Sequence, residues 1–296
     1  FKSPGLKNRR QNDKKVAQTI AAMKRSDRVF TVKAPDKDLV AWFGEVQRQC
    51  GIKPHMRIDR PNAYVSQIRQ TAAGKDIFFI SNRSSDERFV IQATFPESKG
   101  SPWLWNAETG ERFPYPGAQG NTLTVDLPPA ASQLIVFDAS SAEGPAAPVL
   151  PAETAGVELT GWKLRMEHIN GTEQEIQLSA LTDLAADEAT RSFAGNLFYE
   201  KTLNSAATCR WLDLGKVYGV SEVTLNGEEL GCRWYGKHLY RIPEHLVNAG
   251  SKTIRVKVTT TLGNYFKSNP QNKVGHGWTR GQAWQPTGLL GPVRFL

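Results

Sequence analysis

The stretch SEVTLNGEELG, residues 221–231, predicts two antiparallel strands joined by a tight turn. Its first five residues alternate polar and apolar side chains, as in a strand with one buried face. Asn226-Gly227 follows, and this pair favours a type I′ turn because both residues accept positive φ angles. We expect a short return strand that leads directly into a loop beginning at Arg233.

Further strand patterns lie on both sides of this hairpin. They are expected at residues 157–165, 196–203, 211–214, 222–225, 238–242 and 253–258. Residues 178–195 predict a short helix or an irregular excursion, with Asp183 and Asp187 on a solvated face. The number of strands fits two antiparallel sheets in the jelly-roll style. Residues 157–296 are therefore predicted to form a C-terminal jelly-roll β-sandwich.

A second group of strand patterns precedes this region. Strands are expected at residues 76–81, 88–95, 121–127 and 132–137, the last two as an antiparallel pair. Short strands separated by turns predict a small β-sandwich over residues 59–140. Trp103 and Trp105 share one face of a strand and are expected in its core. Residues 141–156 are rich in Ala, Pro and Gly, which is typical of a linker.

The first 58 residues predict a short α/β remnant. Val16, Ile20 and Met23 recur at helical spacing. A second helix is expected between an Asp38 cap and a stop at Gly51. The residues expected on its buried side are Leu39, Val40, Trp42, Phe43 and Val46, and a strand is expected at residues 28–32. Because such a unit is too small to close a core, we expect it to belong to a larger domain. The predicted fold class is mainly β.

Composition narrows the range of partners. Hydrophobic residues make up 40% of the 296 residues and charged residues 22%, as in globular proteins. The net charge is +8, but the basic excess is concentrated between Lys2 and Lys24. A solvated basic face is therefore favoured over a nucleic-acid site, and no apolar run is long enough for a bilayer. We expect neither a nucleic-acid nor a membrane partner.

Three widely spaced cysteines, Cys50, Cys209 and Cys232, lack a metal-binding Cys-x-x-Cys spacing. Cys209 and Cys232 could face each other across paired strands, but buried free thiols are favoured.

Hydrolysis of a glycosidic bond requires two carboxyl groups about 5 to 9.5 Å apart. Glu228 and Glu229 are adjacent on a strand and point to opposite faces, so they cannot flank one bond. The Asp183 group, Glu200 and Asp213 are interpreted as solvated charges. His276 is interpreted as a loop histidine, and the chain has no Gly-x-Ser-x-Gly nucleophile motif. No catalytic residue and no metal ligand are predicted.

The region from Trp211 to Tyr265, with its V-x-LNG-x-x-LG hairpin, is similar to the galactose-binding-like jelly roll of family 2 glycoside hydrolases. The segments RWYGKHLYRIP (233–243) and WTRGQAWQPTGLLGPVRF (278–295) resemble the C-terminal end of glycoside hydrolase family 106, the α-L-rhamnosidase-type enzymes. IRQTAAGKDIFFISN (68–82) and LWNAETGE (104–111) also resemble that family. Where the family commonly has His-Arg-Arg, this chain has Ile68-Arg69-Gln70.

The resemblance implies a non-catalytic C-terminal accessory region of an α-L-rhamnosidase-type enzyme that acts on plant or bacterial polysaccharide. In this family the catalytic carboxylates and the metal site lie in an upstream barrel. The chain alone is thus expected to be inactive, with carbohydrate and that catalytic domain as partners. The resemblance also implies a secreted or periplasmic protein, and Ca²⁺ is the one cofactor that such jelly rolls could bind.

Carbohydrate contact is expected where aromatic side chains lie beside polar ones, because sugar rings pack on aromatic faces. The candidate carbohydrate-binding residues are Arg233, Trp234, Tyr235, Trp278, Arg280, Gln282 and Trp284. Two alternatives remain open for them: these aromatics build the core, or they form the seam to a neighbouring domain. Tyr240, in an alternating strand, is interpreted as core. The alternative functions are an autonomous carbohydrate-binding module and a purely structural domain that supports a catalytic barrel.

Overall fold

The computed structural model describes residues 2, 4–35, 37–60, 62–139, 143–148, 156–204 and 208–296. These residues form several antiparallel sheets and a smaller amount of helix, so the mainly β fold class is confirmed. The chain divides into two compact units, Phe1–Arg57 and Ile58–Leu296. The finer division of the second unit stays a prediction, and most of the expected linker at 141–156 lies outside the described residues.

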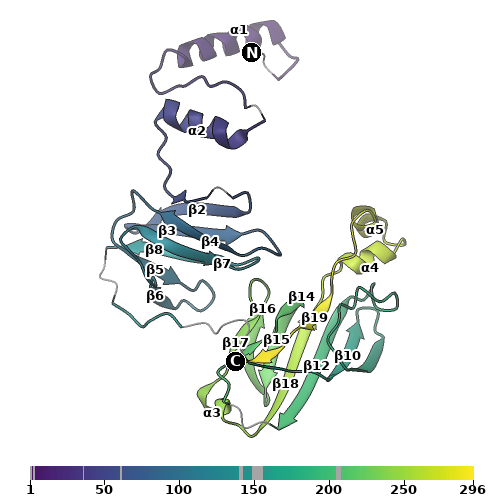
Figure 1. Cartoon of the computed structure of the whole chain (residues 1–296). Coiled ribbons are helices and arrows are strands. Elements are labelled where there is room, and N and C mark those ends of the chain that lie inside the picture. Colours follow the sequence, from purple (N-terminus) through teal and green to yellow (C-terminus); the bar gives the residue numbers. More distant parts are fainter. Residues whose placement is uncertain are drawn as a thin grey trace. The chain divides into compact units, whose positions relative to one another are not determined.

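The first unit contains two helices, α1 (Arg9–Met23) and α2 (Leu39–Cys50) (Figure 1). The Asp38 carboxylate caps α2, because Oδ1 accepts a hydrogen bond from the Ala41 amide at 2.9 Å. Gly51 ends the helix with a φ of 62°, a left-handed conformation that glycine adopts without strain. Both predicted ends of α2 are confirmed.

The predicted buried side of α2 is wrong. No residue of α1 or α2 is buried, and Leu39, Val40 and Phe43 are 61%, 65% and 47% exposed. A helix buries its apolar stripe only when another element packs on it, and the described residues of this unit supply none. The predicted strand at residues 28–32 is also wrong, since these residues pair with no other strand.

The second unit begins with a β-sandwich. One sheet has the order β2 (Val65–Ala72), β3 (Lys75–Asn82), β8 (Ser132–Asp138), β5 (Ser101–Trp105) and β6 (Arg112–Pro114). The other has the order β1 (Arg57–Ile58), β4 (Phe89–Thr94) and β7 (Thr122–Leu127). Their facing side chains form an apolar core in which the rings of Phe78, Phe95 and Phe137 lie 4.7 to 6.0 Å apart.

The predicted antiparallel pair of β7 and β8 is wrong, because the two strands lie in different sheets. β7 pairs with β4, whereas β8 pairs with β3 and β5. Pro128 and Pro129 stand between them. Proline cannot donate to a ladder, so the chain crosses to the other sheet instead of turning back. Trp103 and Trp105, expected in the core, are only partly buried in β5.

A second β-sandwich follows. Its six-stranded sheet has the order β11 (Glu173–Leu178), β10 (Trp162–His168), β12 (Gly195–Asn204), β18 (Ser251–Thr259), β15 (Val220–Leu225) and β16 (Glu228–Arg233). Opposite it lie β17 (Leu239–Arg241), β13 (Trp211–Asp213), β20 (Arg294–Phe295) and β9 (Val157–Glu158), with the pair β14 (Lys216–Tyr218) and β19 (Gly288–Gly291). One continuous apolar cluster fills the space between these layers, from Tyr199 and Val256 on one side to Leu212 and Tyr240 on the other. The interpretation of Tyr240 as core is confirmed.

The hairpin at Asn226-Gly227 is confirmed. These residues have φ angles of 53° and 87°, as a type I′ turn requires. The return strand β16 is longer than expected and carries a bulge at Leu230, because Val223 pairs with Gly231. Arg233, predicted to begin a loop, therefore ends a strand.

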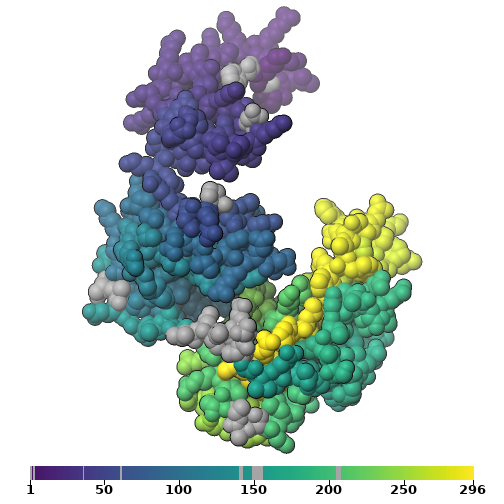
Figure 2. Space-filling model, viewed as in Figure 1, coloured from purple at the N-terminus to yellow at the C-terminus, as the bar shows by residue number. Residues whose placement is uncertain are grey.

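Two short helices, α4 (Gly263–Ser268) and α5 (Lys273–Thr279), lie near one end of the six-stranded sheet (Figure 1), and their residues form a projecting lobe in the space-filling view (Figure 2). A third, α3 (Glu244–Val247), follows β17. The loop assignment of His276 is wrong, because this residue lies within α5. The Asn272 side chain starts α5 by accepting a hydrogen bond from the Gly275 amide at 2.9 Å, and this cap offsets the low helix propensity of the glycines.

Residues 178–195 contain no helix and follow the irregular alternative. Asp183 was expected on a solvated face, and this is wrong. Its Oδ1 accepts hydrogen bonds from the amides of Ala185 and Thr287, both at 2.9 Å. These bonds attach the excursion to the strand region near β19.

All three cysteines are free thiols. Cys209 is buried as predicted, whereas Cys232 is exposed, so the prediction of a buried thiol is wrong for Cys232; Cys50 is half-buried. Within the described part of the chain, no helix is long and apolar enough to cross a membrane.

Candidate functional site

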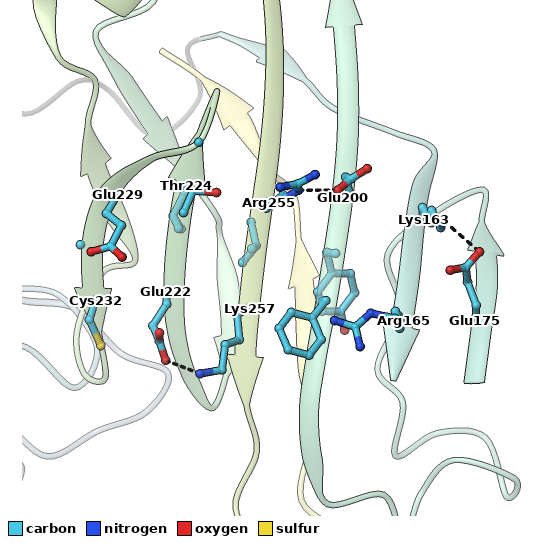
Figure 3. A pocket seen from close by; sticks show the side chains of 16 residues that line it. Lys163, Arg165, Glu175, Glu200, Glu222, Thr224, Glu229, Cys232, Arg255 and Lys257 are labelled. Carbon is cyan, nitrogen blue, oxygen red and sulfur yellow. Dashed lines mark hydrogen bonds and ion pairs between the residues drawn. The ribbon is translucent and has the colours of Figure 1, made fainter. Parts of the chain in front are cut away.

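Polar side chains on the outer face of the six-stranded sheet line an open groove of about 680 Å³ (Figure 3). We call it the sheet groove. Alternation along each strand produces it: on β12, Leu197 and Tyr199 point into the core, whereas Phe198 and Glu200 lie on the outer face. The apolar half of each strand forms the sandwich, which leaves the other half available for contacts.

Strand register aligns the outer residues into two rows that cross all six strands. The first row is Glu175, Arg165, Phe198, Lys257, Glu222 and Cys232. The second row is Gln177, Lys163, Glu200, Arg255, Thr224 and Glu229. Directly paired residues on one face have Cβ atoms about 5 Å apart, so each row is a continuous line of contacts.

Side chains of opposite charge form ion pairs within these rows and between them. Arg255 Nε lies 2.5 Å from Glu200 Oε2, and Lys257 Nζ lies 2.9 Å from Glu222 Oε1 (Figure 3). Lys163 Nζ lies 3.0 Å from Glu175 Oε1. These ion pairs bring long, partly exposed side chains together on the outer face, where their remaining donors and acceptors reach the groove.

An aromatic ring lies within this charged surface. The Arg165 guanidinium lies over the Phe198 ring, 4.2 Å from its centroid, as in a cation–π contact. Thr224 and Glu229 make no side-chain hydrogen bond or ion pair with the described residues. The groove thus offers an apolar ring, paired charged groups and two uncommitted polar side chains.

The predicted site residues separate into two clusters. Arg233 donates a hydrogen bond from Nη1 to Glu108 Oε2 at 3.3 Å, and its guanidinium lies 5.6 Å from the Tyr240 centroid. Burial, followed by the nearby Glu108 carboxylate, raises the pKa of Tyr235. Trp234 is 66% exposed and meets Tyr235 edge-on at 4.7 Å. Arg233 and Tyr235 are committed to contacts within the protein, whereas Trp234 is available.

The second cluster belongs to the α4–α5 lobe. Trp278 is 78% exposed on α5, and Gln282 Nε2 donates to the Trp278 carbonyl at 3.1 Å. Arg280 is exposed as well. Trp284 is half-buried between two cations, 5.6 Å from the Arg191 guanidinium and 5.3 Å from Lys267 Nζ. In this cluster the side chains of Trp278 and Arg280 are accessible, and Trp284 packs against one cation of the lobe and one of the 178–195 excursion.

A buried polar trio lies under β15, and sequence reasoning missed it. Ser221 Oγ lies 2.5 Å from His238 Nδ1 and 2.6 Å from the Tyr240 hydroxyl. The Tyr240 hydroxyl donates to the Ser221 carbonyl at 2.9 Å. Burial lowers the pKa of His238 to about 4. Although a Ser–His pair is typical of nucleophilic catalysis, Ser221 is completely buried, so this trio stabilises the fold.

Glu200 and Asp213, interpreted from sequence as solvated charges, both have partners. Glu200 belongs to the ion pair with Arg255, and the buried Asp213 accepts a hydrogen bond from the Gly215 amide at 2.9 Å. In the part of the chain that the structure describes, no three His, Cys, Asp or Glu side chains are grouped to hold a metal ion. The Ca²⁺ site stays a prediction.

The described part of residues 58–296 thus defines a class of protein region, one built of two antiparallel β-sandwiches with irregular loops. The structure resembles a rhamnosidase from Novosphingobium sp. PP1Y, with a TM-score of 0.65, 20% identity and 96% of this chain covered. The chain spans only 29% of that rhamnosidase. It therefore has the fold of a part of a larger glycoside hydrolase.

Weaker matches involve a family 2 β-galacturonidase from Eisenbergiella tayi, with a TM-score of 0.34, 15% identity, and coverage of 47% of this chain and 23% of that one. A β-glucuronidase from Ruminococcus gnavus matches with a TM-score of 0.30, 20% identity, and coverage of 38% and 23%. No family model matches this sequence, and no curated protein matches it.

Proposed function

We propose that the chain is a non-catalytic C-terminal accessory region of an α-L-rhamnosidase-type enzyme of glycoside hydrolase family 106, whose substrate is plant or bacterial polysaccharide. One observation carries the proposal: nearly the whole chain matches one part of a rhamnosidase that is more than three times as long. The sequence segments 233–243 and 278–295 support the same family. Its second sandwich would be the galactose-binding-like jelly roll, and its partner would be the catalytic barrel of the same protein.

Supporting the catalytic domain is the role that fits this chain best. Three of the four carboxylates in the sheet groove, those of Glu175, Glu200 and Glu222, are paired with basic neighbours, and the Ser–His pair is closed to substrate. The purified chain is therefore expected to release no product from an aryl α-L-rhamnoside. Measurable hydrolysis, lost after substitution of a carboxylate in this chain, would contradict the proposal.

The reading frame upstream of Phe1 provides a second, independent test. We expect it to encode a catalytic barrel that carries the family's carboxylates, and deletion of residues 58–296 from the longer protein should lower its unfolding temperature. A barrel whose stability and rhamnosidase activity do not change on deletion would contradict the supporting role. Secretion or periplasmic export belongs to the same proposal, and fractionation of cells would test it.

A carbohydrate-binding module is the second candidate function. The observation that favours it is the exposure of two tryptophans, Trp234 and Trp278, at 66% and 78%. Exposed aromatic rings are available to stack on sugar rings. If this function is correct, Trp234→Ala or Trp278→Ala will abolish binding of an oligosaccharide by the isolated chain. Bound Ca²⁺ would be revealed by calorimetric titration of the same protein.

A further inference from the structure

We propose that the sheet groove binds a neutral oligosaccharide that lies across the six strands. This inference deepens the proposed function and rests on it, because a region of a glycosidase is held close to saccharides. It places the saccharide on the outer face of the sheet and not on Trp234 or on Trp278 of α5. The groove volume of about 680 Å³ lies within the range of small-molecule sites, roughly 300 to 1,000 Å³.

Charge balance favours a neutral ligand. The groove is lined by four basic side chains, Lys163, Arg165, Arg255 and Lys257, and by four acidic ones, Glu175, Glu200, Glu222 and Glu229. Because the four basic and four acidic charges cancel and are intermixed across the groove, a polyanion meets both attraction and repulsion there. A sugar hydroxyl both donates and accepts hydrogen bonds, so it matches carboxylates and ammonium groups equally well.

The Phe198 ring supplies the apolar contact that a saccharide needs. It lies on β12, the third of the six strands, and belongs to the first row of outer residues. Polar groups flank it on both sides in the same row. Because the Arg165 guanidinium already covers one face of this ring, the C–H face of a sugar ring would pack against the Phe198–Arg165 stack, while hydroxyls of neighbouring rings reach Glu200 and Lys257. With strands about 4.8 Å apart, the rows extend roughly 24 Å, enough for several sugar rings.

A protein surface fits the groove less well. Cores of protein–protein interfaces are depleted in Lys, Glu and Asp and enriched in aromatic residues. This groove has eight charged side chains and only one outward aromatic ring, Phe198, among its lining residues. Covering it with an apolar partner would bury these ion pairs away from water, at a cost that their mutual attraction repays only with excellent geometry.

Calorimetric titration of the whole chain tests the proposal. The probes are rutinose, cellotetraose, xylotetraose and maltotetraose as neutral saccharides, and tetragalacturonate as an anionic comparison. We expect at least one neutral probe to bind at millimolar concentration. Phe198→Ala should weaken that binding about tenfold because a stacked ring is lost, and Glu200→Gln should weaken it because a charged acceptor is lost.

Thr202→Ala is the matched control. Thr202 lies on the same strand and the same outer face, but it contacts Thr253 outside the groove lining, at 3.0 Å. This variant should bind as the unchanged chain does. Circular dichroism and thermal unfolding of all variants will show that the outward substitutions leave the fold intact.

Three outcomes would overturn the inference. One is the absence of binding by every neutral probe. Another is tighter binding of tetragalacturonate than of any neutral probe. The last is binding that Trp234→Ala or Trp278→Ala removes while Phe198→Ala and Glu200→Gln retain it. The proposed function is tested by other measurements, namely hydrolysis of an aryl rhamnoside and the unfolding temperature of the longer protein. None of the three outcomes above changes the result expected in those measurements.

Discussion

At the scale of single residues, the buried trio of Ser221, His238 and Tyr240 carries a pH-dependent share of the stability. His238 is 5% exposed, and its imidazole has Ser221 Oγ as its hydrogen-bond partner. Desolvation is the main cause that lowers the pKa of His238 to about 4, and the cationic Arg233 lowers it further. The anionic Asp213 raises this pKa, but by less. The folded protein therefore keeps this side chain neutral under mildly acidic conditions.

We predict that the free energy of unfolding falls as the pH is lowered from 6.5 to about 4. In this window the unfolded state protonates His238 and the folded state does not, so protons favour unfolding. The stabilisation is fully present above 6.5, and its loss amounts to roughly 3 kcal/mol. Urea unfolding at a series of pH values measures it. His238→Gln should flatten the slope, whereas His245→Gln, at an exposed position, should keep it.

A substitution at Gly227 tests whether the turn requires a positive φ, because no other residue contacts a Cβ atom at this position. Its φ is 87°, and a methyl group added there would meet no atom within 4 Å. Gly227→Ala should therefore lower the free energy of unfolding by about 1 to 2 kcal/mol through backbone strain alone. Gly250→Ala is the control, since Gly250 also has open space but lacks a positive φ. Equal stability of the two variants in urea unfolding would contradict the turn assignment.

At the scale of elements, a hydrogen bond between β12 and β19 joins the two layers of the second sandwich, in addition to those between Ser221 and Tyr240. The Tyr199 hydroxyl on β12 accepts from the Leu289 amide on β19 at 3.1 Å. We predict that Tyr199→Phe lowers the free energy of unfolding by about 1 to 3 kcal/mol, because a buried amide loses this acceptor. Tyr218→Phe, at a site that is 37% exposed, should change it little. Thermal unfolding of both variants provides the comparison.

Local sequence patterns predicted most strands, turns and helix ends correctly, but they did not predict which strands pair or what packs on a helix. The alternation around β12 and β18, the Asn226-Gly227 turn and the Asp38 cap all depend on neighbouring residues, and all were predictable. The assignment of β7 and β8 to different sheets depends on contacts between distant residues, which a two-residue period does not encode. The exposure of α2 was missed for the same reason: its sequence shows an apolar side but not whether anything covers it.

The sheet groove could not be predicted from sequence, although its residues are all visible there. Glu200 and Lys257 look like ordinary solvated charges on separate strands. They become part of one surface only because β12 pairs with β18, and β18 with β15, in a particular register. Aromatic residues next to polar ones are visible within a short stretch of sequence. For this reason the sequence analysis predicted Trp234 and Trp278 as site residues and not the groove.

At the scale of the whole molecule, charge is divided unequally along the chain. Residues 1–57 contain 14 basic and 5 acidic residues, a net charge of +9. The remaining 239 residues contain 23 basic and 24 acidic ones, a net charge of −1. The high isoelectric point of the chain is therefore a property of its first unit, and the two sandwiches are nearly neutral.

We predict that a chain of residues 58–296 keeps the main unfolding temperature of the full chain and no longer binds a cation-exchange column at neutral pH. Both results follow from the first unit, which has the basic excess and whose helices contribute no buried residue. Differential scanning calorimetry and ion-exchange elution measure them. A large drop in unfolding temperature would show that residues 1–57 stabilise the second unit.

The order of strands in the six-stranded sheet also has a kinetic meaning. β15 and β16 are joined by two residues, and such hairpins close in about 1 to 10 microseconds. The central pair is different: Thr202 on β12 meets Thr253 on β18 across 51 positions of the chain. The chain loses conformational entropy when this long loop closes, before the contacts between the two strands stabilise it. The rate-limiting event would therefore be the pairing of β12 with β18. The Asn226-Gly227 hairpin would then be formed in advance as a template onto which β18 adds.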